Sequence, residues 1–394
     1  MLNRKKVIYV PALRMKKGEL EGLFWLRGDV ADCIVPMLIV PPVQERNSSS
    51  QESLFATDKS IPDVGGVVSK YWVHRQVFVD PRVLFKEHGA DKAVDWLPAL
   101  FSRARNRGVY AIPCASLVTL EELGVAAFKS AISASDDLKF CLSIQSGDMT
   151  DLNVDARVQN VLQDLGLKPS ECVVIADFTD ADLSEPSFVA PIIRSALEQL
   201  QDLGQWQMIV FLGTNYPEKN PAKAGQTFTC PRNEWHAWTQ AVRFDPSTAD
   251  QMVFGDFAAD SAKIDFKAGR AQPIRHSRYT TSANWLVVRG DAEGSDYEVM
   301  KDVFERIVAN AAFSGETFSN ADAYIYDVAR NNSPKAGNAT TWRQVNTAHH
   351  ITQVVADVAT VRNIPISKIP NAPAGTQQNL SGVDLASVPS GGHS

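Results

Sequence analysis

Residues 172–178 (CVVIADF), 186–203 (PSFVAPIIRSALEQLQDL) and 207–213 (QMIVFLG) form the stretch that decides the fold. The first and third segments are almost continuously apolar, which is typical of strands buried on both faces. The middle segment repeats apolar residues at helical spacing and is polar between them. Strand, helix and strand in this order predict two parallel strands joined by a crossover helix.

The same alternation extends in both directions from this unit. Further strand-like runs occupy residues 7–13, 34–40, 76–80, 109–115, 139–145 and 252–257, and helical spacing recurs at 18–27, 91–107 and 151–165. Eight such units over about 260 residues predict a closed (β/α)8, TIM-barrel-like domain in which strand eight pairs with strand one. An open doubly wound sheet is the alternative, but no Gly-x-Gly-x-x-Gly turn follows the first strand.

The alternation of strand-like and helical segments ends after Ala258, where the sequence predicts a C-terminal α+β extension. Its expected elements are a strand at 284–289, a helix at 296–311, a short strand at 323–328 and a last helix at 342–361. The predicted organisation is a barrel domain over 1–268, the extension over 269–361 and a disordered tail over 362–394. A mobile loop is expected at 43–66, which is interpreted either as a lid over the barrel mouth or as a silent insertion.

Composition limits the class of protein. The chain has 394 residues, a net charge of -6 and 44% hydrophobic residues, which are ordinary globular values. Its acidity argues against a surface covered in nucleic-acid-binding charge. Five cysteines at wide spacing, without Cys-x-x-Cys, argue against a disulfide framework or a zinc ribbon. The longest apolar run, 33–43, contains three prolines and is too short to span a membrane, so a cytoplasmic protein is expected.

Several segments, taken in order, resemble the phage-associated beta protein family, the beta family proteins of bacteria and phages. These segments are 9–20 (YVPALRMKKGEL), 35–42 (VPMLIVPP), 213–217 (GTNYP), 232–235 (RNEW), 254–257 (FGDF), 278–280 (RYT) with Trp285 and 289–290 (RG), 341–343 (TWR) and 349–352 (HHIT). The resemblance covers residues 7–360. It implies a phage or anti-phage defence context, including a protein partner from such a system, but brings no defined reaction with it. The family's Pro-Leu-Ile-Glu-Ile-Pro pattern carries a glutamate where this chain has Ile39, which puts in doubt any activity that needs that glutamate.

Polar residues at strand ends are the first candidate site, because a barrel gathers them at one mouth. They are Asp80, Gln145, Asp148, Asp177, Asp180, Thr214, Asn215, Asp256 and Asp260. Asp177 and Asp256 are the preferred catalytic candidates, since each lies inside an apolar strand where helix capping explains less. Converging carboxylates would act as an acid–base pair or bind a hard metal ion such as Mg²⁺. The alternative interpretation is that these acids form turns or helix caps.

The second candidate is a basic segment. Between Gly269 and Gly290 there is no acid, but Arg270, Arg275, His276, Arg278 and Arg289 occur, with Tyr279 and Trp285 between them. Arginine beside aromatic rings suits contact with a phosphate-bearing ligand or nucleic acid. The alternative is a solvated hairpin whose arginines pair with acids elsewhere in the chain.

The last helix supplies the third candidate. Its predicted apolar stripe is flanked by Arg343, Asn346 and His350, whereas His349 faces away. His350 would serve as a catalytic acid or base, and Arg343 as an anion contact; a boundary histidine bonded to a backbone carbonyl is the alternative. The sequence thus predicts an anion site built from Arg278, Arg289, Arg343 and His350, with Tyr279, Thr214 and Asn215 as further ligand contacts. The competing hypothesis is a barrel hydrolase or lyase that uses the strand-end carboxylates.

Overall fold

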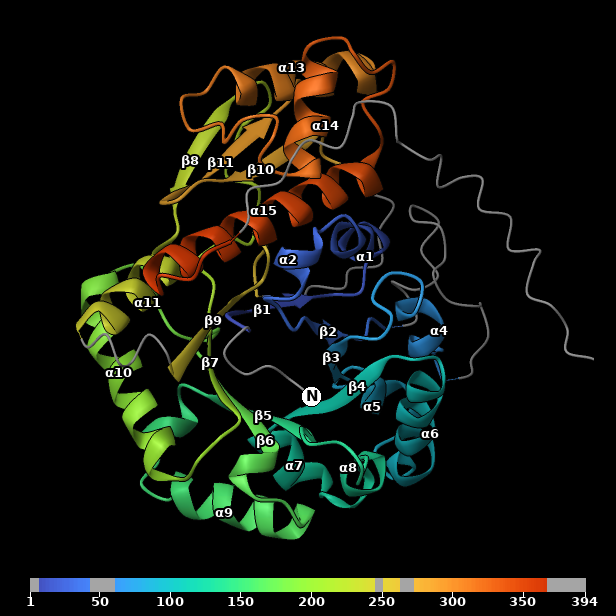
Figure 1. The fold of residues 1–394 in the computed structure, drawn as a ribbon, viewed down its shortest axis with the longest axis vertical. Helices are drawn as coiled ribbons and strands as arrows, with labels where there is room; N and C mark the ends of the chain where they lie inside the picture. Colours follow the sequence, from blue (N-terminus) through green and yellow to red (C-terminus); the bar gives the residue numbers. More distant parts are fainter. Residues whose placement is uncertain (1–6, 43–60, 245–250, 263–272, 367–394) are drawn as a thin grey trace, which may run out of the picture.

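The computed structural model describes residues 7–42, 61–244, 251–262 and 273–366. Eight parallel strands close into a barrel, as predicted, with helices between them around the outside (Figure 1). The strands are β1 (Tyr9–Leu13), β2 (Met37–Ile39), β3 (Gln76–Asp80), β4 (Tyr110–Ser116), β5 (Phe140–Gln145), β6 (Cys172–Asp177), β7 (Met208–Leu212) and β9 (Met252–Asp256). The first and eighth strands of the barrel pair in parallel, with Tyr9 opposite Phe254 and Pro11 opposite Asp256.

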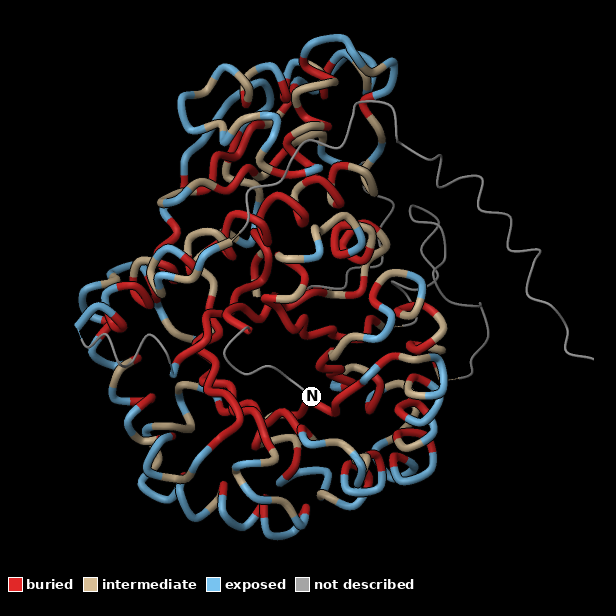
Figure 2. Tube along the Cα trace, viewed as in Figure 1, coloured by how far each residue is buried: buried red, intermediate tan, exposed pale blue. Residues whose placement is uncertain are grey.

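The helices of the barrel cover the outer face of these strands. They are α1 (Lys17–Phe24), α2 (Gly28–Ala31), α4 (Val64–Val68), α5 (Leu84–His88), α6 (Ala93–Asn106), α7 (Leu117–Leu123), α8 (Ala126–Ala131), α9 (Val154–Leu165), α10 (Pro186–Asp202) and α11 (Asn233–Phe244). The strands are buried except at some of their ends, such as Tyr110 of β4 and Gln145 of β5 (Figure 2). Alternate residues fill the barrel interior, such as Val173 and Ile175, and pack against the helices, such as Val174.

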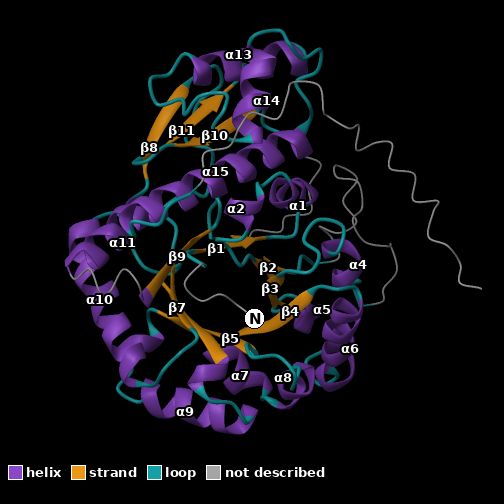
Figure 3. Ribbon diagram, viewed as in Figure 1, coloured by secondary structure: helices purple, strands orange, loops and turns teal. Residues whose placement is uncertain are grey.

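The extension is a three-stranded antiparallel sheet covered by helices (Figure 3). Its strands are β10 (His276–Thr280), β11 (Asn284–Arg289) and β8 (Thr227–Pro231), and its helices are α13 (Asp296–Val308) and α14 (Asn320–Ala329). The edge strand β8 comes from the connection between β7 and α11, so two separate insertions build this sheet. The strand predicted at 323–328 is wrong: these residues lie in α14, where the Ser319 side chain caps the helix by accepting from the backbone N–H groups of Ala321 and Asp322.

The last helix, α15 (Ala339–Val361), joins the two parts of the molecule. Its first half packs Trp342 and Val345 into the extension, and its second half packs Ile351 and Val354 against the barrel. Figure 1 shows α15 beside α1, and α15 also contacts α2 and β1, so it closes the ring of helices after β9. His349, expected to face away from the buried stripe, is itself buried because the extension covers that side of the helix.

Two glycines let α1 approach α15 closely. A Cβ on Gly18 would overlap the carbonyl oxygen of Thr340, and one on Gly22 would lie 2.8 Å from Cβ of Thr347. Glycine at these two positions therefore sets the distance between the helices, and with it the place of the α15 side chains that face the barrel rim.

Part of the sequence-based description lies outside the described residues. The expected mobile loop at 43–66 is described only from residue 61, and the expected tail at 362–394 only to residue 366. Arg270 of the basic segment is also not among the described residues. Within the described ranges, no helix is long and apolar enough to cross a membrane.

Candidate anion site between the barrel rim and the extension

Five charged side chains meet where the barrel rim contacts the extension. Arg14 follows β1, Glu19 lies on α1, Asp260 follows β9, Arg278 lies on β10 and Arg343 lies on α15; we call these five residues the outer cluster. The loops after β1 and β9 leave the carboxyl ends of parallel strands, so they come together at the same end of the barrel. The extension and α15 then close over that edge.

Asp260 is the hub of the outer cluster. Its Oδ1 lies 3.0 Å from Nη1 of Arg278, and its Oδ2 lies 3.2 Å from Nη1 of Arg14 and 3.3 Å from Nη1 of Arg343. Arg343 also pairs with Oε1 of Glu19 at 3.2 Å. Three guanidinium groups thus face two carboxylates, which leaves one positive charge in excess.

Electrostatics in the outer cluster follow from this charge balance. Burial alone would raise the pKa of Asp260, but Arg278, Arg14 and Arg343 outweigh it and hold that pKa far below its usual range. Burial, together with Arg278, lowers the pKa of the neighbouring His276 to about 3, so its ring is neutral at physiological pH. Nε of Arg278 donates to Nε2 of that ring at 3.1 Å. The surplus positive charge therefore belongs to the arginines.

The outer cluster faces an open cavity. A hollow of about 150 Å³ is lined by Glu19, Asp260, His276, Arg278 and Arg343, among others. It adjoins a larger cleft of about 910 Å³, because both are lined by Pro273, Ile274, Ala339 and Trp342.

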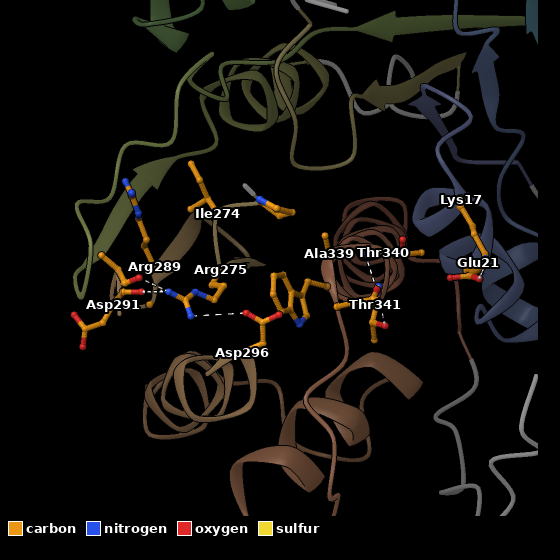
Figure 4. Close-up of a pocket in the computed structure, with 15 residues that line it drawn as sticks. Lys17, Glu21, Ile274, Arg275, Arg289, Asp291, Asp296, Ala339, Thr340 and Thr341 are labelled. Carbon is orange, nitrogen blue, oxygen red and sulfur yellow. Dashed lines mark hydrogen bonds and ion pairs between the residues drawn. The ribbon is translucent and has the colours of Figure 1, made fainter. Parts of the chain in front are cut away.

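The larger cleft lies between α1 and the extension (Figure 4). Arg275 is held there by the carbonyl oxygen of Gly294 at 2.6 Å and by Asp296 at 3.7 Å. Lys17 and Glu21 lie on the opposite side, with the first turn of α15 between the two sides. The cleft is polar and carries both signs of charge.

A second polar group, which we call the inner cluster, lies deeper between the barrel wall and α15. It consists of Tyr9, Asp256, Thr280 and His350, which are essentially inaccessible to solvent. Nε2 of His350 donates to Oδ2 of Asp256 at 2.9 Å, and the Tyr9 hydroxyl donates to Oδ1 at 2.5 Å. The Thr280 hydroxyl donates to Nδ1 of His350 at 2.8 Å.

This pattern is satisfied by a neutral histidine with its proton on Nε2. Burial lowers the pKa of His350, in agreement with that form. Burial would raise the pKa of Asp256, but its contacts with His350, Tyr9 and the Ala258 N–H reverse the shift and lower that pKa. An ionised carboxylate with several donors, closed off from solvent, makes a stable junction rather than a reactive site.

The two preferred catalytic carboxylates do not meet. Asp177 shares the inward face of β6 with Val173 and Ile175 and accepts from Ser143 and Thr179. Asp256 points out of the barrel towards α15. Within the described residues, no group of three or more His, Cys, Asp or Glu side chains is arranged to hold a metal ion.

The other predicted contact residues are distributed over several places. Arg278 and Arg343 come together in the outer cluster, whereas His350 belongs to the inner cluster. Arg289 lines the larger cleft and donates to the carbonyl oxygen of Ala222 at 3.1 Å. The Tyr279 hydroxyl points into the extension and donates to Asp322 at 2.7 Å.

The predicted pair after β7 has structural partners at the rim. The Thr214 hydroxyl donates to the backbone oxygen of Asp260 at 3.0 Å. The Asn215 backbone N–H donates to Oε2 of Glu234 at 3.2 Å, and the other oxygen of Glu234 is buried without a hydrogen-bond partner among the described residues. Burial raises the pKa of Glu234 to about 8.

Sequence reasoning missed Arg14 and Glu19 as members of the site. Both lie in the first segment of the family resemblance, and both precede or begin a helix, where charge is commonplace. The one available signal was position: Arg14 directly follows the first barrel strand and therefore lies at the mouth.

The comparisons with known proteins place the chain in a family. A family model described as Beta protein matches residues 9–356, most of the chain, and the protein therefore belongs to the beta protein family. A search of curated proteins found no match. The matched range includes every residue of the outer and inner clusters.

Proposed function

We propose that this beta family protein binds a phosphate-bearing ligand at the outer cluster. The observation that carries the proposal is the surplus of arginine around Asp260 at the wall of an open cavity. Arginine presents a planar fork of N–H donors that matches phosphate oxygens, and the partial burial of Arg278 and Arg343 strengthens such contacts. The adjoining cleft offers room for the rest of a ligand of nucleotide size.

The position of the outer cluster supports the same conclusion by analogy with other barrels. TIM-barrel enzymes frequently bind phosphate with the loops that follow the seventh and eighth strands. Here those strands are β7 and β9, and the loops after them meet at the bond from Thr214 to Asp260. The hydrolase or lyase alternative has less support, because Asp177 and Asp256 face opposite sides of the barrel wall.

Titration calorimetry with pyrophosphate at low salt tests the proposal. Arg343→Ala should weaken binding about tenfold or more, and Arg343→Lys should be intermediate because it keeps the charge but loses the fork. Arg330→Ala is the matched control, since this exposed arginine at the end of α14 lines neither cavity. Raising the salt concentration should weaken binding to the native protein.

Two results would contradict the proposal. One is pyrophosphate affinity that is the same in the native protein and in Arg343→Ala. The other is binding only to a macromolecule, such as single-stranded nucleic acid or a protein partner, with no response to pyrophosphate. In that second case the cleft would serve as an interaction surface instead.

A further inference from the structure

We propose that Asp260 is a specificity-determining residue that occupies the place of the ligand's phosphoryl group, so that the site selects dianionic phosphoryl groups over monoanions. The inference rests on the proposed function and adds the class of ligand. Binding would exchange the Asp260 carboxylate for phosphoryl oxygens on the same three arginines.

The contacts of Asp260 are those expected of a bound anion. Both carboxylate oxygens accept from guanidinium groups, and these come from three elements far apart in the chain. The carboxylate belongs to the connection that follows β9, whereas Arg278 and Arg343 stand on a strand and on a long helix. The loop is thus the part that can yield while the arginines stay in place.

The backbone next to Asp260 is strained. Ala258 and Ala259 have φ values of 50° and 59°, so two consecutive residues with a Cβ adopt the left-handed conformation. This conformation costs free energy for any residue except glycine and gathers at functional sites and switches. Arg278 holds the strained segment by donating to the carbonyl oxygen of Ala259 at 2.9 Å, and Asp256 holds it by accepting from the Ala258 N–H at 2.9 Å. Nη1 of Arg278 contacts both the Ala259 carbonyl oxygen and the Asp260 carboxylate, so displacement of Asp260 would let the strained backbone relax.

Charge balance identifies the ligand class. With Asp260 in place, the three arginines and two carboxylates of the outer cluster carry one net positive charge. With Asp260 displaced, three arginines face Glu19 alone and the net charge is two. The terminal phosphate of a phosphomonoester, which carries close to two negative charges near neutral pH, matches this value. Each phosphoryl group of pyrophosphate is also more negative than a diester. A phosphodiester carries one charge and has no advantage over the carboxylate that is already tethered there.

The experiment compares Asp260→Asn with Glu19→Gln by calorimetry with pyrophosphate and with a dimethyl phosphate diester. Both variants remove one negative charge from the outer cluster, but only Asp260→Asn removes the proposed competitor. Asp260→Asn should raise pyrophosphate affinity about tenfold or more, clearly above the gain in Glu19→Gln, and should make diester binding measurable. Equal gains in the two variants, or a loss in Asp260→Asn, would overturn the inference.

A second variant tests the strain directly and leaves every charge in place. Ala259→Gly relaxes the loop while Asp260 is engaged, so it should weaken pyrophosphate binding several-fold; unchanged or tighter binding counts against displacement. The outcomes separate the two proposals. If Arg343→Ala abolishes pyrophosphate binding but Asp260→Asn and Ala259→Gly do not change the affinity as expected, only the displacement of Asp260 is contradicted. If neither the native protein nor Asp260→Asn binds pyrophosphate, the proposed function is contradicted as well.

Discussion

The outer and inner clusters share three elements but differ in exposure and in charge balance. Strand β9 with the loop after it, strand β10 and helix α15 each supply one residue to either cluster. Those residues are Asp260, Arg278 and Arg343 in the outer cluster, and Asp256, Thr280 and His350 in the inner cluster. The outer cluster is partly exposed and has surplus charge. The inner cluster is closed, and its hydrogen bonds are matched donor to acceptor. On each shared element, the two clusters are therefore only a few residues apart, although the outer cluster is suited to ligand exchange and the inner cluster is a fixed junction.

The largest expected effect comes from breaking the inner cluster. Asp256→Ala should lower the free energy of unfolding by about 3–5 kcal/mol, because it leaves buried donors on Tyr9 and His350 without an acceptor. Urea denaturation measures this loss. Asp155→Ala, at an exposed position on α9, should change stability by less than about 0.5 kcal/mol. A loss below about 1 kcal/mol for Asp256→Ala would show that the inner cluster is not the junction described here.

The next effect depends on pH. Burial raises the pKa of Glu234 to about 8, well above its unfolded value. The folded state therefore holds an extra proton between about pH 4.5 and pH 8, and stability falls as pH rises through this window. Glu234→Gln should remove that fall and make the protein more stable than the native chain by about 2 kcal/mol or more at pH 9, with no gain at pH 4.

Urea denaturation at several pH values checks the Glu234 prediction. Glu293→Gln, a change at an exposed glutamate, is the matched control and should leave the pH profile unchanged. Parallel pH profiles for Glu234→Gln and the native protein would mean that the buried carboxyl does not hold the extra proton.

A smaller effect sharpens the contrast between the clusters. Thr280→Val keeps the shape of the side chain but removes the donor to Nδ1 of His350, so stability should fall by about 1–2 kcal/mol. Pyrophosphate affinity should stay within about twofold, because Thr280 does not line the cavity. A large loss of affinity in this variant would show that the two clusters are coupled.

The smallest stability effect is expected in the outer cluster. Arg343→Ala should change the free energy of unfolding by no more than about 1 kcal/mol, since Arg343 is one-quarter exposed. Asp260 keeps Arg14 and Arg278, and Glu19 keeps the backbone N–H groups of Arg14 and Lys16. Its effect should instead appear in ligand affinity. Thermal unfolding with and without pyrophosphate measures both, and a loss of several kcal/mol without ligand would place Arg343 among the structural residues.

The barrel was predictable because its strands are continuous apolar runs separated by amphipathic helices. The strand β8 was not, since its five residues (TFTCP) form a short run that ends in proline and is mostly exposed. Residues 323–328 (AYIYDV) are rich in aromatic and β-branched side chains and favoured a strand, but tertiary packing and the Ser319 cap decide for a helix. Local preference fails here because the neighbours that bury α14 come from elsewhere in the chain.

The site was predictable only in part, and the reason is the pattern of the barrel strands. Because β6 and β9 are apolar on both faces, their sequences do not reveal which side each residue faces. Asp177 and Asp256 therefore looked equivalent, although one points into the barrel and the other out. Arg278 and Arg343, both predicted ligand contacts, share Asp260 in the structure. The other members of the outer cluster, Arg14 and Glu19, come from the start of the chain, which no local pattern indicates.

The position of α15 also has a consequence for the order in which the molecule can assemble during synthesis. Residues 339–361 complete the wall of helices beside the first barrel strand, so a growing chain cannot cover that wall until the extension has been made. Strand β8 likewise cannot pair until β11 has been made, and β11 is translated some fifty residues later. A nascent chain that stops after β9 would leave Tyr9 and Asp256 facing water, and is expected to depend on chaperones until the last helix arrives.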